Sequence, residues 1–353
     1  MGFLKGTATF SRFRLPSGGA DLDEGEFERR LKAFSFRDFF PLEAEHNMGW
    51  TSLEDVLDSS FRRHPPTVGP FRLFCLRKDR RAVPAALLKL RCLEAERRFL
   101  SERGVKRLYR NQRDTIREEV RRDLTEKAEA VPTFTDVCWS LRDGIVYFGS
   151  LSPREMQDFV DMFRRTFDLE AVLLDPARDL PPGEGEAPPF MHRDFLTWLW
   201  FKAQERDGTV AIDDTEEVEV LFVRRLVLAS GEGEYAEQVI CSGRHADLRE
   251  GKEAVRQGKR IKEARLRLTR DTARWEFTYK ADTASFSAMK IPAPAEEAEE
   301  GEDGDGMLLE RIYLMERAAV TMDLLFGRFA AVRLSPAWEE EAARMERWAN
   351  RSA

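Results

Sequence analysis

The strongest constraint on the fold is a highly charged stretch, residues 89–122, with the pattern of two helices joined at a glycine. Pro84 suits the first turn of a helix that runs to about Arg103, Gly104 ends it, and a second helix is expected over residues 112–128. The stretch holds twelve Lys or Arg and six Asp or Glu, in a chain whose net charge at pH 7 is −7. The sequence therefore predicts a basic helical hairpin, and this charge asymmetry favours a surface that meets a polyanion.

The first helix of the predicted hairpin is apolar on two sides. One side carries Leu90, Leu93 and Leu100, and the nearly opposite side carries Leu88, Cys92, Ala95 and Phe99. A helix of this kind packs between two neighbours, or between its own body and a partner subunit.

The second helix carries a ridge of arginines beside an apolar ridge. The arginines are Arg113, Arg117 and Arg121, and the apolar residues are Ile116, Val120 and Leu124. The connection adds Lys106, Arg107 and Arg110. We expect these six bases to bind DNA while the apolar ridges pack. The alternative is a solvated face whose charges pair with nearby carboxylates.

A second basic region covers residues 244–270, with ten bases and four acids. Lys259, Arg260 and Lys262 lead into an alternating strand. The alternation places Arg265 and Arg267 on one face and Leu266 and Leu268 on the other. These five bases are the second set of predicted DNA contacts, because a row of cations on a strand can follow a phosphate backbone. A salt-bridged, solvated face is again the alternative.

Helical and strand patterns alternate along the rest of the chain and predict an α+β fold with antiparallel sheets. Helices are expected over residues 21–34, 152–167, 192–203 and 246–257, and strands over 70–77, 133–142, 145–150, 217–229, 235–241, 261–269, 274–281 and 285–291. Asp143-Gly144 is the expected turn of one β-hairpin.

The expected organisation has seven parts. Residues 1–82 and 131–179 form a central region around the helical hairpin of residues 83–130, residues 180–190 are a linker, and residues 191–292 form a second α+β region. An acidic linker spans 293–306, with seven acids and no base over 296–305, and helices fill 307–353.

The first of these C-terminal helices has a heptad seam. Its apolar positions are Leu308, Ile312, Met315, Ala319, Met322, Phe326 and Phe329. Such a seam is typical of a buried core helix or of a dimer interface. We expect the first six residues to form a dimer interface, and a buried core helix is the alternative.

The sequence lacks the common catalytic signatures. The glycines and lysine at 251–259 fail the P-loop spacing, and the four histidines and four cysteines have no metal-ligand spacing. We therefore expect no catalytic residue, no metal and no cofactor, although abundant carboxylates leave a metal-dependent nuclease open. No apolar run approaches the roughly 18 residues of a membrane helix, and scattered cysteines favour a reducing cytoplasm.

Several short elements, in order, resemble the recombination-associated RdgC family, most closely its longer, divergent branch. They are Asn47-Met48-Gly49-Trp50, Arg81-Ala82-Val83-Pro84, Glu102-Arg103-Gly104-Val105-Lys106, Phe195-Leu196-Thr197-Trp198-Leu199 and the Gly258-Lys259 step before paired strands. The chain departs from the family in its Pro-rich insert, its acidic linker and its heptad helix. It also lacks the Pro-Arg-Ala-Phe element after the hairpin.

The resemblance implies an α+β fold with a helical tip and a ring-shaped homodimer. Such a ring would enclose double-stranded DNA without sequence preference and restrain the RecA recombinase in the bacterial nucleoid. The tip would be residues 84–128, facing DNA or the partner's tip, and Lys259 would lie near the ring interior. Our leading hypothesis is accordingly a non-catalytic duplex-DNA-binding protein. A protein-interaction scaffold is the first alternative, and a metal-dependent nuclease is the second.

Overall fold

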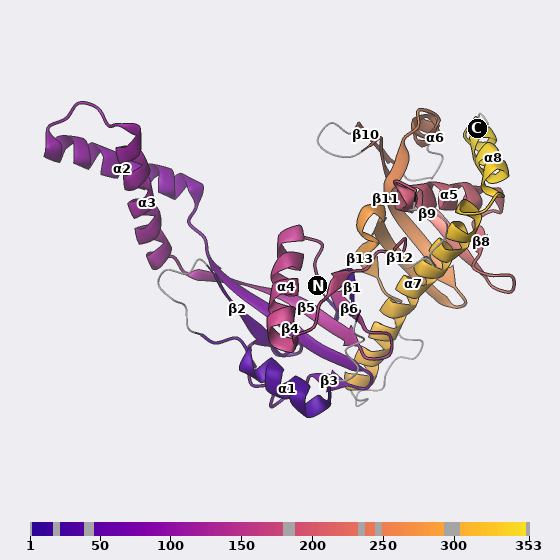
Figure 1. The fold of residues 1–353 in the computed structure, drawn as a ribbon, viewed down its shortest axis with the longest axis horizontal. Helices are drawn as coiled ribbons and strands as arrows, with labels where there is room; N and C mark the ends of the chain where they lie inside the picture. Colours follow the sequence, from indigo (N-terminus) through magenta and orange to yellow (C-terminus); the bar gives the residue numbers. More distant parts are fainter. Residues whose placement is uncertain are drawn as a thin grey trace. The chain divides into compact units, whose positions relative to one another are not determined.

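The computed structural model describes residues 2–16, 22–38, 46–178, 188–231, 237–243, 249–292 and 304–350. Figure 1 shows helices and strands intermixed along the chain, and the printed strand pairs are antiparallel apart from one isolated parallel bridge. The predicted α+β class is therefore confirmed. Within the described ranges, no helix is long and apolar enough to span a membrane.

The helices are α1 (Glu24–Ala33), α2 (Ala85–Arg103), α3 (Arg110–Lys127), α4 (Pro153–Phe167), α5 (Met191–Glu205), α6 (Arg249–Arg256), α7 (Gly304–Arg333) and α8 (Trp338–Asn350). The strands are β1 (Ala8–Arg14), β2 (His46–Thr51), β3 (Thr67–Val68), β4 (Phe71–Arg81), β5 (Ala130–Ser140), β6 (Ile145–Phe148), β7 (Val172–Leu173), β8 (Thr209–Ala211), β9 (Glu217–Ala229), β10 (Gln238–Ser242), β11 (Arg260–Arg270), β12 (Ala273–Lys280) and β13 (Ser285–Lys290). The predicted elements match these within a few residues. Most of the two expected linkers, the start of the strand predicted at 235 and the start of the helix predicted at 246 lie outside the described residues.

The chain forms two compact units. Unit 1 comprises Met1–Asp21, Thr67–Arg72 and Val137–Ala353, and unit 2 comprises Leu22–Pro66 and Leu73–Asp136. The helical hairpin thus belongs to unit 2, and the second basic region belongs to unit 1.

Unit 1 is built on an antiparallel sheet with the strand order β10-β9-β11-β12-β13-β1-β6. On β11 and β12, Leu266, Leu268, Trp275 and Phe277 point into the core. Helix α5 lies over this face beside β9 and β11 (Figure 1), where the hydroxyl of Thr197 accepts a hydrogen bond from the backbone N–H of β11 at 3.0 Å. The opposite face of these strands carries the charged residues.

Helix α4 illustrates how local sequence positions an element of unit 1. Ser152 caps its first turn by accepting from the N–H of Glu155, and the proline after it suits the first helical position. The apolar side of α4 then packs on the sheet, where Phe159 lies 5.1 Å from Phe13 and 4.5 Å from Phe148, measured between ring centroids.

Helix α7 carries the predicted heptad seam into the core of unit 1. Leu308, Ile312, Met315, Ala319, Met322 and Phe326 are at most 7% exposed. Phe326 lies 5.3 Å from Phe195 and stacks on His192 at 5.1 Å. The seam is therefore filled by this chain's own side chains, as the core-helix alternative requires. A dimer contact through it would require α7 to leave its core, and we propose no such contact.

In unit 2, β2 pairs with β4 from His46 opposite Arg80 to Thr51 opposite Cys75. Gly49 on β2 is required by close packing, because a Cβ there would lie 2.3 Å from the Cα of Phe36. The next residue, Trp50, is fully buried against Phe74. The sequence did not predict β2, because its six residues do not alternate between apolar and polar side chains.

The hairpin of unit 2 has a thin core. Helix α2 contains no buried residue, and in the rest of the hairpin Leu108 and Ile116 are buried. Gly104 ends α2 in the left-handed conformation with φ of 62°, as predicted. The two-sided pattern of α2 is also present, because Leu90 and Leu93 remain 52% and 45% exposed while the opposite side faces α3.

Candidate nucleic-acid interface

Helix α3 concentrates arginines on one face. Arg110, Arg113, Arg117 and Arg121 follow one another at spacings of three or four residues, so their side chains share a stripe along the helix. We call these four residues the arginine stripe. Glu119 and Asp123 of α3 fall on another part of the helix surface, whereas Asp114 lies at the edge of the stripe, four residues after Arg110. The stripe therefore carries an excess of positive charge over about 16 Å, at 1.5 Å per residue.

The loop between α2 and α3 extends this surface. Lys106 and Arg107 are exposed, and Leu108 beside them is 5% exposed and anchors the loop. The backbone N–H of Tyr109 donates to the side chain of Gln112 at 3.0 Å and so fixes the start of α3. The loop bases are thus held next to the first arginine of the stripe.

The cations of the stripe and loop are exposed and free of carboxylate partners. Among the described residues, the ion pairs of the hairpin are Arg91 with Glu94 at 2.8 Å and Lys127 with Asp123 at 2.6 Å, and neither includes a predicted DNA contact. In the hairpin, then, the salt-bridged alternative does not describe the six predicted contacts.

The five predicted contacts of the second basic region are paired with carboxylates. Lys259 lies 3.0 Å from Glu237, Arg260 pairs with Asp194, Lys262 lies 3.7 Å from Asp282, and Arg265 and Arg267 lie 3.0 Å and 3.9 Å from Glu276. The predicted alternation is confirmed, because Leu266 and Leu268 are buried on the other face. Each of these five bases therefore has a carboxylate within ion-pair distance, although Arg265 and Arg267 share Glu276.

Lys259 differs most from its expected role. Its side chain is 8% exposed, and besides Glu237 it contacts the side chain of Gln257 at 3.3 Å. A lysine in this setting holds the turn between α6 and β11, and it would need to leave both partners to contact a phosphate.

Sequence reasoning missed the carboxylates that pair with these bases. Glu276 and Lys290 join the β11 arginines across three strands, while Asp194 pairs with Arg260 from α5. The alternation of β12 could have placed Glu276 on the charged face. Its register with β11 and β13 could not be read from one sequence.

The two basic regions lie in different compact units. Each surface is therefore defined within its own unit.

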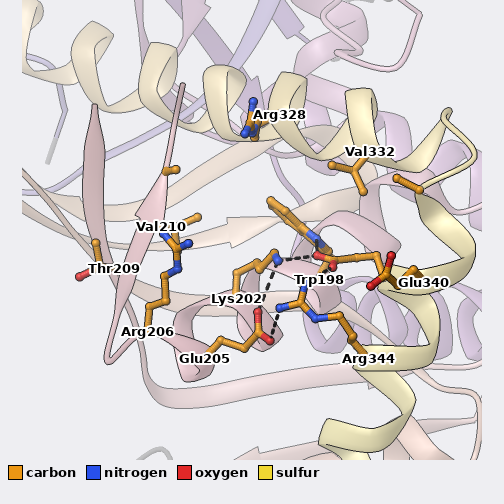
Figure 2. A pocket seen from close by; sticks show the side chains of 13 residues that line it. Trp198, Lys202, Glu205, Arg206, Thr209, Val210, Arg328, Val332, Glu340 and Arg344 are labelled. Atoms are coloured by element: carbon orange, nitrogen blue, oxygen red, sulfur yellow. Dashed lines mark hydrogen bonds and ion pairs between the residues drawn. The ribbon is translucent and has the colours of Figure 1, made fainter. Parts of the chain in front are cut away.

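Unit 1 also contains a pocket of about 340 Å³ between α5, β8, α7 and α8. Figure 2 shows Lys202 and Glu205 of α5 beside Arg344 of α8 in this pocket. Glu341 of α8 accepts from Trp198 at 2.9 Å and pairs with Lys202 at 2.6 Å. Arg344 pairs with Glu341 at 3.0 Å and also with Glu205. Burial opposes ionisation of Glu341, but these hydrogen bonds and charges outweigh it and hold its pKa below the usual range. The charged groups of this pocket thus tie α8 to α5.

Metal-ligating side chains are dispersed in the described part of the chain. No three His, Cys, Asp or Glu side chains gather there as ligands of one metal ion. The four cysteines are free thiols, and three of them are buried.

Comparison with known proteins places the hairpin within a family. No curated protein matches the chain. A family model described as "Putative exonuclease, RdgC" matches residues 10–180, from β1 through β7, and so includes the whole of α2 and α3. The second basic region and the pocket lie after this match. Over residues 10–180 the chain matches the RdgC family, as the motifs within them predict.

Proposed function

We propose that this protein binds duplex DNA without sequence preference and that the arginine stripe of α3 is its principal contact. The stripe carries the proposal because its four guanidinium groups are exposed on one helix face without carboxylate partners in the described structure. The match to the RdgC family model supports a recombination-associated protein. Arginine favours phosphate because its planar fork donates two parallel hydrogen bonds.

The stripe matches a duplex in length. Duplex DNA presents one negative charge per about 1.7 Å of axis, so about 16 Å of helix faces roughly ten phosphates, several of them on the near side. Contacts of this kind displace counterions, and the affinity then falls with salt by about 0.9 in log K for each phosphate contact. The acidic remainder of the chain would keep DNA on its basic surfaces.

The test is duplex binding to unrelated sequences across a salt series, followed by fluorescence anisotropy. We expect similar affinities for all sequences and a steep salt dependence. Binding that is insensitive to salt, or that is absent at low salt, contradicts the proposal.

We further propose that the protein acts as a ring-like homodimer, and we place the second copy against the exposed apolar side of α2. On this helix Leu87, Leu90 and Leu93 are 36%, 52% and 45% exposed. Neighbouring exposed apolar side chains of this kind are typical of a protein–protein contact. The solution mass should correspond to a dimer, and Leu90→Glu should give a monomer. A wild-type monomer that still binds DNA would contradict this part alone.

Restraint of the RecA recombinase follows as a steric consequence. A protein that occupies or encircles duplex DNA denies the recombinase its substrate without contacting it. Strand exchange by RecA should then be inhibited by the wild-type protein and not by a variant that lacks the arginine stripe. Equal inhibition by both proteins would favour the alternative of a protein-interaction scaffold.

The name of the matching family model favours a nuclease as the second candidate. Incubating labelled linear duplex with magnesium or manganese tests it. Shortening of the DNA that requires the metal and survives repeated purification would replace the non-catalytic proposal.

A further inference from the structure

The open sheet face of unit 1 contains a row of charges built across three strands. In the strand registers, Arg267 of β11 stands opposite Glu276 of β12, and Glu276 stands opposite Lys290 of β13. Arg265 lies diagonally beside them and donates to Glu276 from two nitrogens at 3.0 Å and 3.2 Å. One carboxylate therefore sits among three cations.

The exposure of these groups shows which of them a ligand can reach. The side chains of Arg265 and Glu276 are 14% and 12% exposed, whereas Arg267 and Lys290 are 37% and 58% exposed. The outer cations also stand farther from the carboxylate, at 3.9 Å and 3.8 Å. Arg265 and Glu276 thus form a fixed pair, while Arg267 and Lys290 keep access to solvent on either side of it.

The electrostatics agree with this division. Partial burial works against ionisation of Glu276, but the hydrogen bond from Arg265 and the charges of Arg265 and Lys290 outweigh it and hold the pKa of Glu276 below its usual range. Glu276 is ionised at neutral pH, and the group of four residues has an excess of two positive charges. Such an excess on a strand surface suits the phosphodiester backbone of DNA.

We infer that Glu276 is a positioning residue of a second phosphate-binding surface, where it holds Arg265, Arg267 and Lys290 together and limits the affinity of that surface for DNA. The carboxylate takes the place between the cations that a phosphate oxygen would otherwise occupy, so a bound phosphate meets the outer cations with an anion behind them. This inference rests on the proposed function, because it assigns the same ligand to a second region.

The decisive variant is Glu276→Gln, which removes the charge and keeps the shape. A unit charge about 6 Å from a phosphate in water is worth about threefold in affinity, so duplex binding should tighten about threefold and its salt dependence should steepen. Most substitutions at a merely structural residue would weaken binding or leave it unchanged. A gain in affinity is therefore a diagnostic readout.

A matched control separates this local effect from net charge. Glu263 stands opposite Lys280 on the same strand pair, with 3.8 Å between the charged groups. Glu263→Gln changes the net charge of the protein equally but releases one cation instead of three. We expect a smaller gain from it. Equal gains from both variants would overturn the inference in favour of long-range charge.

A second variant keeps the test decisive if Glu276→Gln does not fold. Arg267→Ala with Lys290→Ala removes two exposed side chains, so the fold should persist and the salt slope should fall by about 0.9 for each lost phosphate contact. In this background Glu276→Gln should give no gain. An unchanged slope in the double variant overturns the inference.

The outcomes also separate this inference from the proposed function. If the wild-type protein binds no duplex at low salt, the proposed function fails. If binding is lost on removal of the arginine stripe but is indifferent to Glu276 and to the outer cations, only the second surface fails.

Discussion

The arginines of α3 and those of β11 both belong to regions rich in basic residues, but they differ in the side chains that surround them. The arginine stripe belongs to a helix with one buried residue, and it has no carboxylate within ion-pair distance in the described structure. On β11, Arg260, Arg265 and Arg267 each face a carboxylate from a neighbouring element. Cations that are buried and closely paired hold a fold together, whereas exposed cations remain available to a ligand, so charge count alone does not locate a binding surface.

The largest effect should come from unfolding the hairpin itself. Ile116 is 7% exposed, and Ile116→Asp would bury a charge in a core too thin to compensate for it. We expect duplex binding to fall to the background level. All seven tryptophans lie outside α2 and α3, so tryptophan fluorescence should report an intact remainder of the protein.

Ile116→Val is the matched control, since it shortens the same side chain at a cost of about 1 kcal/mol. Its binding should stay close to that of the wild type. If Ile116→Asp also retains binding, the hairpin is not the DNA-binding element.

The free energy of unfolding should depend on the paired arginines of β11 and little on the exposed arginines of α3. Arg270 on β11 is 17% exposed, forms two hydrogen bonds with Glu216 at 2.6 Å and 2.8 Å and donates to Thr321 at 3.0 Å. Arg270→Ala should lower the free energy of unfolding by about 2–3 kcal/mol, because it strands a paired carboxylate. Arg117→Ala on the exposed stripe should change it by less than about 0.5 kcal/mol. Urea unfolding followed by far-UV circular dichroism reports on the helices and strands of both units, and equal losses would erase the contrast between the two regions.

The sequence was sufficient where the pattern is local. The glycine that ends α2, the serine cap of α4 and the alternation of β11 each depend on neighbouring residues, and all three predictions are confirmed. Pairing between distant segments could not be predicted. Asp194 and Arg260 are 66 positions apart in the chain, and their contact depends on how α5 packs on the sheet. For the same reason, the heptad spacing of α7 could not decide between a buried core helix and a dimer interface.

The pKa values of two carboxylates in the paired region should shift in opposite directions from their ordinary values. Burial raises the pKa of Asp194 above 3.8, and its pairing with Arg260 and Arg333 offsets only part of this. The pKa of Glu276, in contrast, lies below 4.5. Glu276 therefore contributes stability that is present above its ordinary pKa and is lost as the pH falls through the lower, folded value. For Asp194, stability rises as the carboxyl gains its proton.

Carboxyl carbon chemical shifts, followed by NMR during an acid titration, measure both groups in one sample. We expect the pKa of Asp194 to lie above its ordinary value and the pKa of Glu276 to lie below its own. A pKa of Asp194 below its ordinary value would mean that the pairing with Arg260 is stronger than the effect of burial.

The central claim is that availability, and not number, decides which bases bind DNA. Its most direct measurement is the salt dependence of duplex binding for two triple variants of equal charge change in the hairpin. One replaces Arg113, Arg117 and Arg121 with glutamine, and the other replaces Arg97, Arg98 and Arg122, which are exposed in the same hairpin but lie off the stripe. We predict that the first variant lowers the slope of log K against log salt by about 2.7 and that the second changes it little. Equal slopes in the two variants would contradict the account.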